Sequence, residues 1–329
     1  MARDTRMVTK TTKKISRNVV RKERRSPRSI FLATLALVSS SIAPALAASI
    51  SIPNGSFESP FATFGVDPHI DSWQKTAQPP DYDPSGNYLW EQLTGVFQNT
   101  TNTSPDHIDN CDGNQAAWMF ADPEVGLFQD YNTMDWNDST PTHAFNAIFE
   151  PGKSYHLKLG LIGGGYGMLD GVTLQLSLYY RDALSNQVIV GAATIAYNST
   201  IFTNRTHFID FSADVPAVKA SDPWAGKNIG IQILSTVDTN LQGGYWDLDN
   251  VRLTSIREPV LVNPAVTNRQ FSFSVQSEPG YNVEILAATN LPAASWTSLG
   301  TFSNVSGTVS FSQMTTNAPR RYYRARRLP

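Results

Sequence analysis

Four aromatic side chains in loop-like stretches are the residues best suited to hold a ligand. Tyr82, Tyr88 and Trp90 lie in or beside the Pro-, Asp- and Gly-rich stretch 77–87, and Trp136 lies in a turn-like stretch among Asp and Asn residues. Flat aromatic faces stack on the apolar face of a pyranose, and nearby polar groups bond its hydroxyls. The combination predicts sugar recognition, with plain packing of each ring as the open alternative.

Motifs of common catalytic sites are absent from the sequence. There is no G-x-S-x-G, H-E-x-x-H or P-loop, and the five His residues are scattered singly. The glycine-rich stretch 163–167 precedes a strand pattern, so it lacks the helix N-terminus of a phosphate cradle. Many carboxylates remain, and two of them could form a glycosidase pair. We therefore predict that the protein is not an enzyme, with a polysaccharide-acting hydrolase as the minor alternative.

The N-terminal segment has the features of an export signal. Eleven Lys and Arg residues lie within residues 1–29, and the apolar run 30–38 follows them. Small residues at Ala45 and Ala47 suit a signal peptidase. The apolar run is interrupted too early to span a membrane. We predict a signal peptide over 1–47 and a secreted, periplasmic or cell-surface protein.

Charge divides the remaining chain into an acidic part and a short basic part. Residues 48–258 hold 9 basic and 24 acidic side chains, whereas 259–329 hold 6 and 2. Phosphates need a Lys/Arg face, so the acidic part argues against nucleic acid and suits a cation or a neutral partner such as a polysaccharide. The basic part suggests an anionic envelope polymer as a partner, or else a solvated strand end. Its cluster consists of Arg320, Arg321, Arg324, Arg326 and Arg327.

Alternation of apolar and polar residues dominates the patterned stretches. It is clear in 155–161 and 171–181, and no long window shows a helical stripe. Clusters of Gly, Pro, Asn and Asp separate these stretches as turns. The fold class is therefore predicted to be all-β. We divide the exported chain into a domain over 48–256, a linker over 257–264 and a module over 265–329.

Several motifs of the first domain resemble the galactose-binding-like jelly roll, a β-sandwich shared by carbohydrate-binding module families. They are IPNGSFESP (52–60), DGNQAAWMF (112–120), GLFQDY (126–131) and YWDLDNVRL (245–253). The resemblance implies that the first and last strands lie side by side. It also implies a secreted carbohydrate-binding protein of bacterial type.

The same resemblance implies a structural calcium where those two strands meet. The matching positions are Asn54 and Gly55, through backbone oxygens, together with Glu58 and Asp249, and Asp247 is a possible extra ligand. Calcium takes six to eight hard oxygens. The alternative is a turn at Asn54 and Gly55, a solvated Glu58 and an Asp249 that caps a strand end.

The C-terminal stretches resemble a small sandwich module of secreted proteins, of the immunoglobulin or fibronectin kind. They are YNVEILAATNL (281–291), SWTSLGTF (295–302), SGTVSF (306–311) and RRYYRARR (320–327). No catalytic role attaches to that module. The whole chain is thus predicted to be a non-catalytic, lectin-like carbohydrate-binding protein. The alternative outside sugar binding is a structural or adhesive envelope protein.

Overall fold

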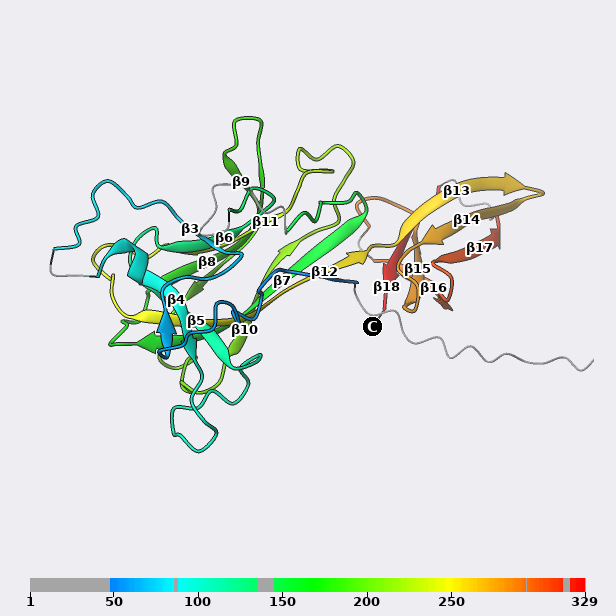
Figure 1. The fold of residues 1–329 in the computed structure, drawn as a ribbon. Helices are drawn as coiled ribbons and strands as arrows, with labels where there is room; N and C mark the ends of the chain where they lie inside the picture. Colours follow the sequence, from blue (N-terminus) through cyan, green and yellow to red (C-terminus); the bar gives the residue numbers. More distant parts are fainter. Residues whose placement is uncertain (1–47, 86–87, 135–144, 294, 316–319, 329) are drawn as a thin grey trace, which may run out of the picture. The chain divides into compact units, whose positions relative to one another are not determined.

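A computed structural model describes residues 48–85, 88–134, 145–293, 295–315 and 320–328, and it confirms the predicted all-β class (Figure 1). The larger part is a β-sandwich of the jelly-roll kind with one seven-stranded and one five-stranded sheet. In the first sheet the order is β10 (Ile209–Val215), β7 (Lys153–Gly165), β12 (Tyr245–Arg257), β5 (Gln115–Phe120), β4 (Thr94–Gln98) and β2 (Val66–Asp67), and β1 (Ala48–Ile50) also pairs with β12. In the second it is β3 (Gln74–Lys75), β6 (Gly126–Gln129), β11 (Gly230–Ser235), β8 (Thr173–Arg181) and β9 (Gln187–Ala196).

The alternation in the sequence explains how the two sheets enclose a core. Successive side chains of a strand point to opposite faces, so every second residue turns inward. In β7, Leu157, Leu159 and Leu161 are fully buried, and in β8 Leu174 and Leu176 are buried as well. All five belong to one hydrophobic cluster that residues of both sheets share. In β7 and β12, the side chains that alternate with the buried ones point to the outer face of the seven-stranded sheet.

The first and last strands of the sandwich are neighbours, as the resemblance implied. Ile50 of β1 pairs with Leu253 of β12 in antiparallel register. Strand β5 pairs with the other end of β12, from Tyr245 to Leu248. Strand β12 therefore pairs with the first described strand, β1, as well as with β5 and β7.

Two three-stranded sheets form the C-terminal part. Their orders are β13 (Val260–Thr267), β14 (Gln270–Gln276), β17 (Thr308–Met314) and β16 (Thr297–Ser303), β15 (Asn282–Ala288), β18 (Tyr322–Arg327). A small core holds Phe273, Val275, Val283, Ile285 and Phe311.

Three of the clustered arginines are engaged within the C-terminal part. Arg326 forms an ion pair with Glu284 of β15. The guanidinium groups of Arg324 and Arg327 each lie 4.5 Å from an aromatic ring centroid, that of Trp296 and that of Tyr281 respectively. Binding of an anionic polymer by this cluster stays a prediction.

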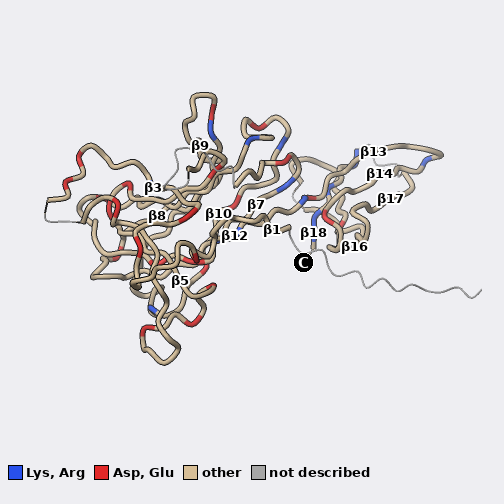
Figure 2. Tube along the Cα trace, viewed as in Figure 1, with Lys and Arg blue, Asp and Glu red and all other residues tan. Residues whose placement is uncertain are grey.

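Figure 2 shows many acidic positions and few basic ones along the larger sandwich.

The predicted signal peptide, 1–47, lies outside the described residues, so export stays a prediction. Within the described ranges, no helix has the length and apolar character to cross a membrane.

Candidate functional site

A block of four side chains lies on the outer face of the seven-stranded sheet. In β12, Trp246 and Leu248 turn into the core, so Tyr245 and Asp247 turn outward. The antiparallel register pairs Tyr245 with Phe120 and Asp247 with Trp118 of β5. Two neighbouring strands thus place one carboxyl and three aromatic rings together.

Glycines on the flanking strands make room for two of these rings. A Cβ atom at Gly95 of β4 would lie 2.3 Å from the Trp118 ring, and one at Gly165 of β7 would lie 2.6 Å from the Tyr245 ring. Such distances are far below any van der Waals contact, so a larger residue at either position must move the ring. The two glycines therefore leave space for the Trp118 and Tyr245 rings beside the backbone of the flanking strands.

We call the resulting cavity the acid pocket; its volume is about 750 Å³. Phe97, Trp118, Phe120, Tyr245 and Tyr88 give it aromatic walls, and Asp247 faces it. Its polar margin includes Asp106, Gln92 and Arg205. A cavity of this size suits a ligand of the size of a small natural product.

Asp247 is the titratable group of interest in this pocket. Burial raises the pKa of its carboxyl to about 7, and the nearby Arg205 guanidinium opposes that shift. A carboxyl with such a pKa is part protonated near neutral pH and can donate a proton. The acid pocket therefore combines an acid with aromatic faces that stabilise positive charge.

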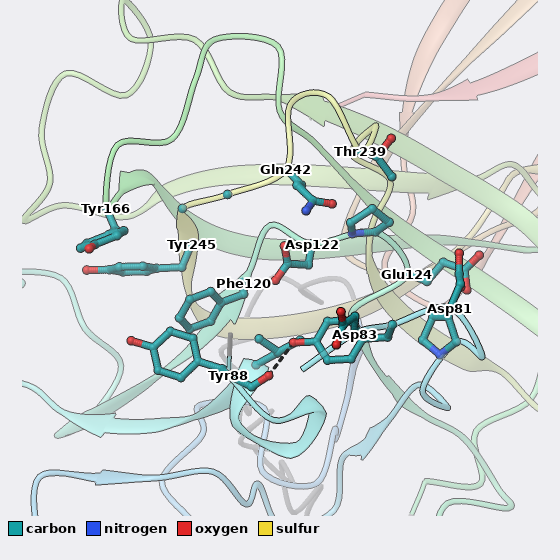
Figure 3. Close-up of a pocket in the computed structure, with 16 residues that line it drawn as sticks. Asp81, Asp83, Tyr88, Phe120, Asp122, Glu124, Tyr166, Thr239, Gln242 and Tyr245 are labelled. Carbon is teal, nitrogen blue, oxygen red and sulfur yellow. Dashed lines mark hydrogen bonds between the residues drawn. The ribbon is translucent and has the colours of Figure 1, made fainter. Parts of the chain in front are cut away.

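A second hollow of about 540 Å³ adjoins the acid pocket and shares three of its walls, Tyr88, Phe120 and Tyr245. The shared rings form a row: the Tyr88 and Phe120 centroids are 5.0 Å apart, and those of Phe120 and Tyr245 are 6.0 Å apart. Figure 3 shows aromatic rings on one side of this second hollow and the carboxyl groups of Asp81 and Glu124 on the other.

The predicted ligand-binding aromatics fall in different environments. Tyr82 and Tyr88 line the second hollow, and the Tyr82 hydroxyl donates a hydrogen bond of 2.7 Å to the Tyr88 carbonyl. Trp90 begins η1 (Trp90–Leu93) and is only 5 % exposed, so its ring packs in the core where no sugar can stack on it. Its indole N–H donates to the Thr76 carbonyl. Trp136 lies outside the described residues.

The oxygens of the residues predicted to bind calcium accept hydrogen bonds from other groups of the protein. The Gly55 carbonyl accepts from the Val251 amide, and the Asn54 carbonyl accepts from the Trp73 indole. The Glu58 carboxylate accepts from the amides of Asn114 and Gln115.

Asp249, the fourth of them, is fully buried and accepts from the amides of Asp112 and Asn250. Burial raises the pKa of its carboxyl to about 7. Nowhere in the described ranges do three or more His, Cys, Asp or Glu side chains gather as a metal site. Calcium binding stays a prediction.

Sequence reasoning missed the central residues of the acid pocket. It did not name Trp118 among the ligand-binding aromatics, and it treated Asp247 only as an extra calcium ligand. Trp73 and Trp246 are buried, whereas Trp118 lines the pocket. The available signal was the alternation of YWDLD (245–249), which puts an acid and an aromatic on the face opposite the buried Trp246.

Comparison with known proteins overturns the prediction of non-catalytic sugar binding. The sequence model of the HpiC1-like family, described as HpiC1 cyclase, matches residues 48–254. That range covers the whole two-sheet sandwich except its last residues. The family is one of enzymes, so both the predicted lectin-like function and the predicted absence of catalysis are wrong.

Solved structures of similar fold include cyclases and carbohydrate-binding modules. A cyclase from Fischerella sp. TAU is 22 % identical, with a TM-score of 0.44 over 64 % of this chain and 98 % of that one. A Stig cyclase from the same organism, in complex with (3Z)-3-(1-methyl-2-pyrrolidinylidene)-3H-indole, is 21 % identical, with a TM-score of 0.43 and the same coverage.

The xylan-binding domain CBM22-1 from Paenibacillus barcinonensis is 8 % identical, with a TM-score of 0.31 over 56 % of this chain and 85 % of that one. No curated protein matches the chain. Because these structural likenesses are distant, the family model alone decides the assignment. A sandwich of this kind hosts both binding and catalysis, which is why the resemblance read from the sequence reached the fold but not the activity.

Proposed function

Because the chain belongs to the HpiC1-like cyclase family, we propose that it is an enzyme that closes a ring in an unsaturated, largely apolar substrate. Asp247 is the proton donor of this reaction, and the acid pocket is the active site. The observation that carries the proposal is a carboxyl whose pKa is raised to about 7 and which faces an aromatic-walled cavity. Perturbed acids in clefts are typical of catalytic sites.

The reaction begins with proton transfer from the Asp247 carboxyl to one carbon of a carbon–carbon double bond. The electron pair of that double bond forms the new C–H bond, and a carbocation remains on the other carbon. A second double bond or aromatic ring of the same molecule attacks the cation and closes the ring. A neighbouring C–H then loses its proton to the Asp247 carboxylate, which restores the acid. The product is therefore an isomer of the substrate.

The walls of the acid pocket suit the charged intermediate. Trp118, Phe120 and Tyr245 present ring faces, and such faces attract a cation by about 0.5–2 kcal/mol each. Apolar walls also exclude water, which would otherwise capture the cation. The pocket thus favours internal ring closure over hydration.

Arg205 acts on the acid as a positioning residue. Its side chain lines the acid pocket, and its positive charge favours the ionised form of Asp247. It therefore stabilises the carboxylate that remains after proton donation. The opposing effect of burial is larger, so the carboxyl still holds its proton near neutral pH.

The test is isomerisation in deuterated water. The protein is incubated with a panel of acyclic polyenes that carry an aromatic ring, and isobaric products are separated by chromatography and mass spectrometry. The proposal expects a cyclic isomer that carries one deuterium on carbon, because Asp247 exchanges with solvent between turnovers. Asp247→Asn is expected to abolish the product. Asp214→Asn, which alters an exposed carboxylate paired with His156, serves as the matched control.

Two results would overturn the assignment of Asp247. One is a cyclic product that carries no deuterium. The other is undiminished product from the Asp247→Asn variant, with its fold verified by circular dichroism. Product that is lost equally in both aspartate variants also counts against a specific role of Asp247.

A further inference from the structure

The second hollow carries more negative charge than the acid pocket, where Arg205 lines the cavity together with Asp106 and Asp247. Four carboxylates line it, those of Asp81, Asp83, Asp122 and Glu124, and none of the described residues that line it is Lys, Arg or His. Its aromatic lining consists of Tyr82 and Tyr166 beside the three shared rings. Figure 3 shows Asp122 lying between the aromatic side and the other carboxylates.

Asp122 is the carboxylate that a ligand in this hollow must meet. It is half-buried, and no hydrogen bond to its side chain occurs within the described part of the chain. Burial raises the pKa of this carboxyl, and only the charge of Lys75 opposes the rise. A neutral ligand that covered Asp122 would remove water from a carboxylate without replacing its interactions, which is unfavourable. A cation would supply the missing partner.

Lys75 compensates little of this negative charge. Its ammonium group is buried 5.0 Å from the Trp90 ring centroid, and none of the described residues forms a hydrogen bond with it. Burial lowers the pKa of the amine to about 7, so much of it is neutral at physiological pH. Lys75 does not line the hollow, and a bound ligand therefore meets the carboxylates and ring faces first.

Aromatic faces together with carboxylates are the chemistry that recognises an organic ammonium ion. We propose that the second hollow binds a positively charged amine, and that the substrate carries this amine while its unsaturated part lies in the acid pocket. The substrate part of the proposal rests on the proposed cyclase activity. The substrate part is supported by the three rings Tyr88, Phe120 and Tyr245, which line both cavities and so make them neighbours.

Binding of a matched pair of probes tests the charge preference without any turnover. Benzyltrimethylammonium is the cation, and its neutral isostere is neopentylbenzene; both are titrated into the full chain and followed by NMR chemical-shift changes. We expect the cation to bind at least fivefold more tightly than the isostere. Its affinity is expected to fall as salt rises, because the attraction is electrostatic.

Four variants locate the site. Asp122→Asn is expected to weaken cation binding at least fivefold and to leave the isostere unchanged. Tyr166→Ala, which alters only the second hollow, is expected to weaken it two- to fivefold. Asp247→Asn and the exposed control Asp214→Asn are expected to stay within twofold of the unaltered protein.

The outcomes separate this inference from the proposed activity. Equal binding of the two probes overturns it, as does a loss of cation binding in Asp247→Asn with none in Asp122→Asn, which would place the cation in the acid pocket. If Asp247 proves unnecessary for ring closure while Asp122→Asn still weakens cation binding, the cation site stands and only the role of Asp247 falls.

Discussion

The acid pocket and the second hollow share three aromatic rings and yet differ in what their acids are able to do. In the acid pocket, Asp247 is buried beside aromatic rings, and burial outweighs the charge of Arg205, so that the pKa of its carboxyl is raised to about 7. In the second hollow, four carboxylates face one cavity, and the charge of Lys75 partly opposes the rise that burial causes in the pKa of Asp122. One wall of rings therefore serves a proton donor on one side and a negative surface on the other.

The comparison teaches that aromatic content alone does not define a site. Tyr88, Phe120 and Tyr245 belong to both cavities, so their chemistry is set by the polar groups that face them. A buried acid with a raised pKa is suited to transferring a proton, whereas several carboxylates beside ring faces are suited to holding a cation. Sequence reasoning counted the rings and the acids but had no means to pair them.

The largest expected effect distinguishes the two acids by kinetics. With a substrate found by the isomerisation screen, Asp247→Asn should lower kcat by about 10²–10⁴-fold, the usual contribution of a general acid. Asp122→Asn should instead raise KM and leave kcat within a few fold, because its carboxylate contacts the part of the substrate that does not react. Steady-state kinetics of both purified variants is the measurement. A large fall in kcat for Asp122→Asn would erase the distinction between the cavities.

The pH dependence of turnover is the second test. Because Asp247 acts in its protonated form, kcat/KM should fall as pH rises through about 7, about tenfold for each further pH unit. Arg205→Gln removes the charge that opposes the raised pKa, so the fall should move to higher pH. A profile that is flat between pH 6 and 9 contradicts the role of Asp247.

The pH dependence of the free energy of unfolding should also report the ionisation of Asp247. The raised pKa means that the folded state holds this proton to a higher pH than the unfolded state, whose carboxyl has a pKa of about 4. The Asp247 contribution to the free energy of unfolding therefore falls as pH rises from about 4 to about 7. In Asp247→Asn this part of the slope should vanish, which denaturant titrations at several pH values measure.

Much of the fold was predictable because strand alternation is written locally. The buried Leu side chains of 155–161 and 171–181 alternate as expected, and the NGSFE and DLDNV motifs at 54–58 and 247–251 correctly implied adjacent first and last strands. The all-β class and the jelly-roll sandwich are confirmed on this basis. Such patterns can be recognised along a single stretch of sequence, without knowing which strands pair.

The site was less predictable because it depends on cross-strand register. Trp118 and Asp247 are far apart in sequence, and only the pairing of β5 with β12 brings them together. Trp90 was assigned to a loop, but a turn of η1 carries its ring into the core. The raised pKa of Asp247 arises from burial, which no residue spacing reveals. A fold-level resemblance then favoured sugar binding, although the family proved to be one of cyclases.

Gly165→Ala should damage both cavities at once, since it acts on a ring that they share. The added methyl group would meet the Tyr245 ring at 2.6 Å and displace it. We expect turnover and benzyltrimethylammonium affinity each to fall about tenfold, because displacements near 1 Å have such effects. The double variant Gly165→Ala with Tyr245→Ala is the control. Its added methyl group has no ring to displace, so its loss of stability should be smaller than the sum of the losses in the two single variants. Loss of only one of the two activities would show that the cavities do not share this wall.

The smallest expected effect comes from Lys75, whose charge acts on Asp122 of the second hollow. The pKa of its amine is lowered to about 7 when folded and is about 10.4 when unfolded, so the folded state binds fewer protons between these values. Its burial is therefore unfavourable below about pH 10 and most unfavourable below about pH 7. Lys75→Met keeps the apolar stem and should raise Tm by a few degrees at pH 6, a gain of about 1–2 kcal/mol, and by less at pH 10. Thermal melts at both pH values measure the difference.

At pH 8 the Lys75→Met variant should bind benzyltrimethylammonium within about twofold of the unaltered protein, because most Lys75 amines are already neutral there. A larger change would mean that Lys75 sets the charge of the second hollow after all.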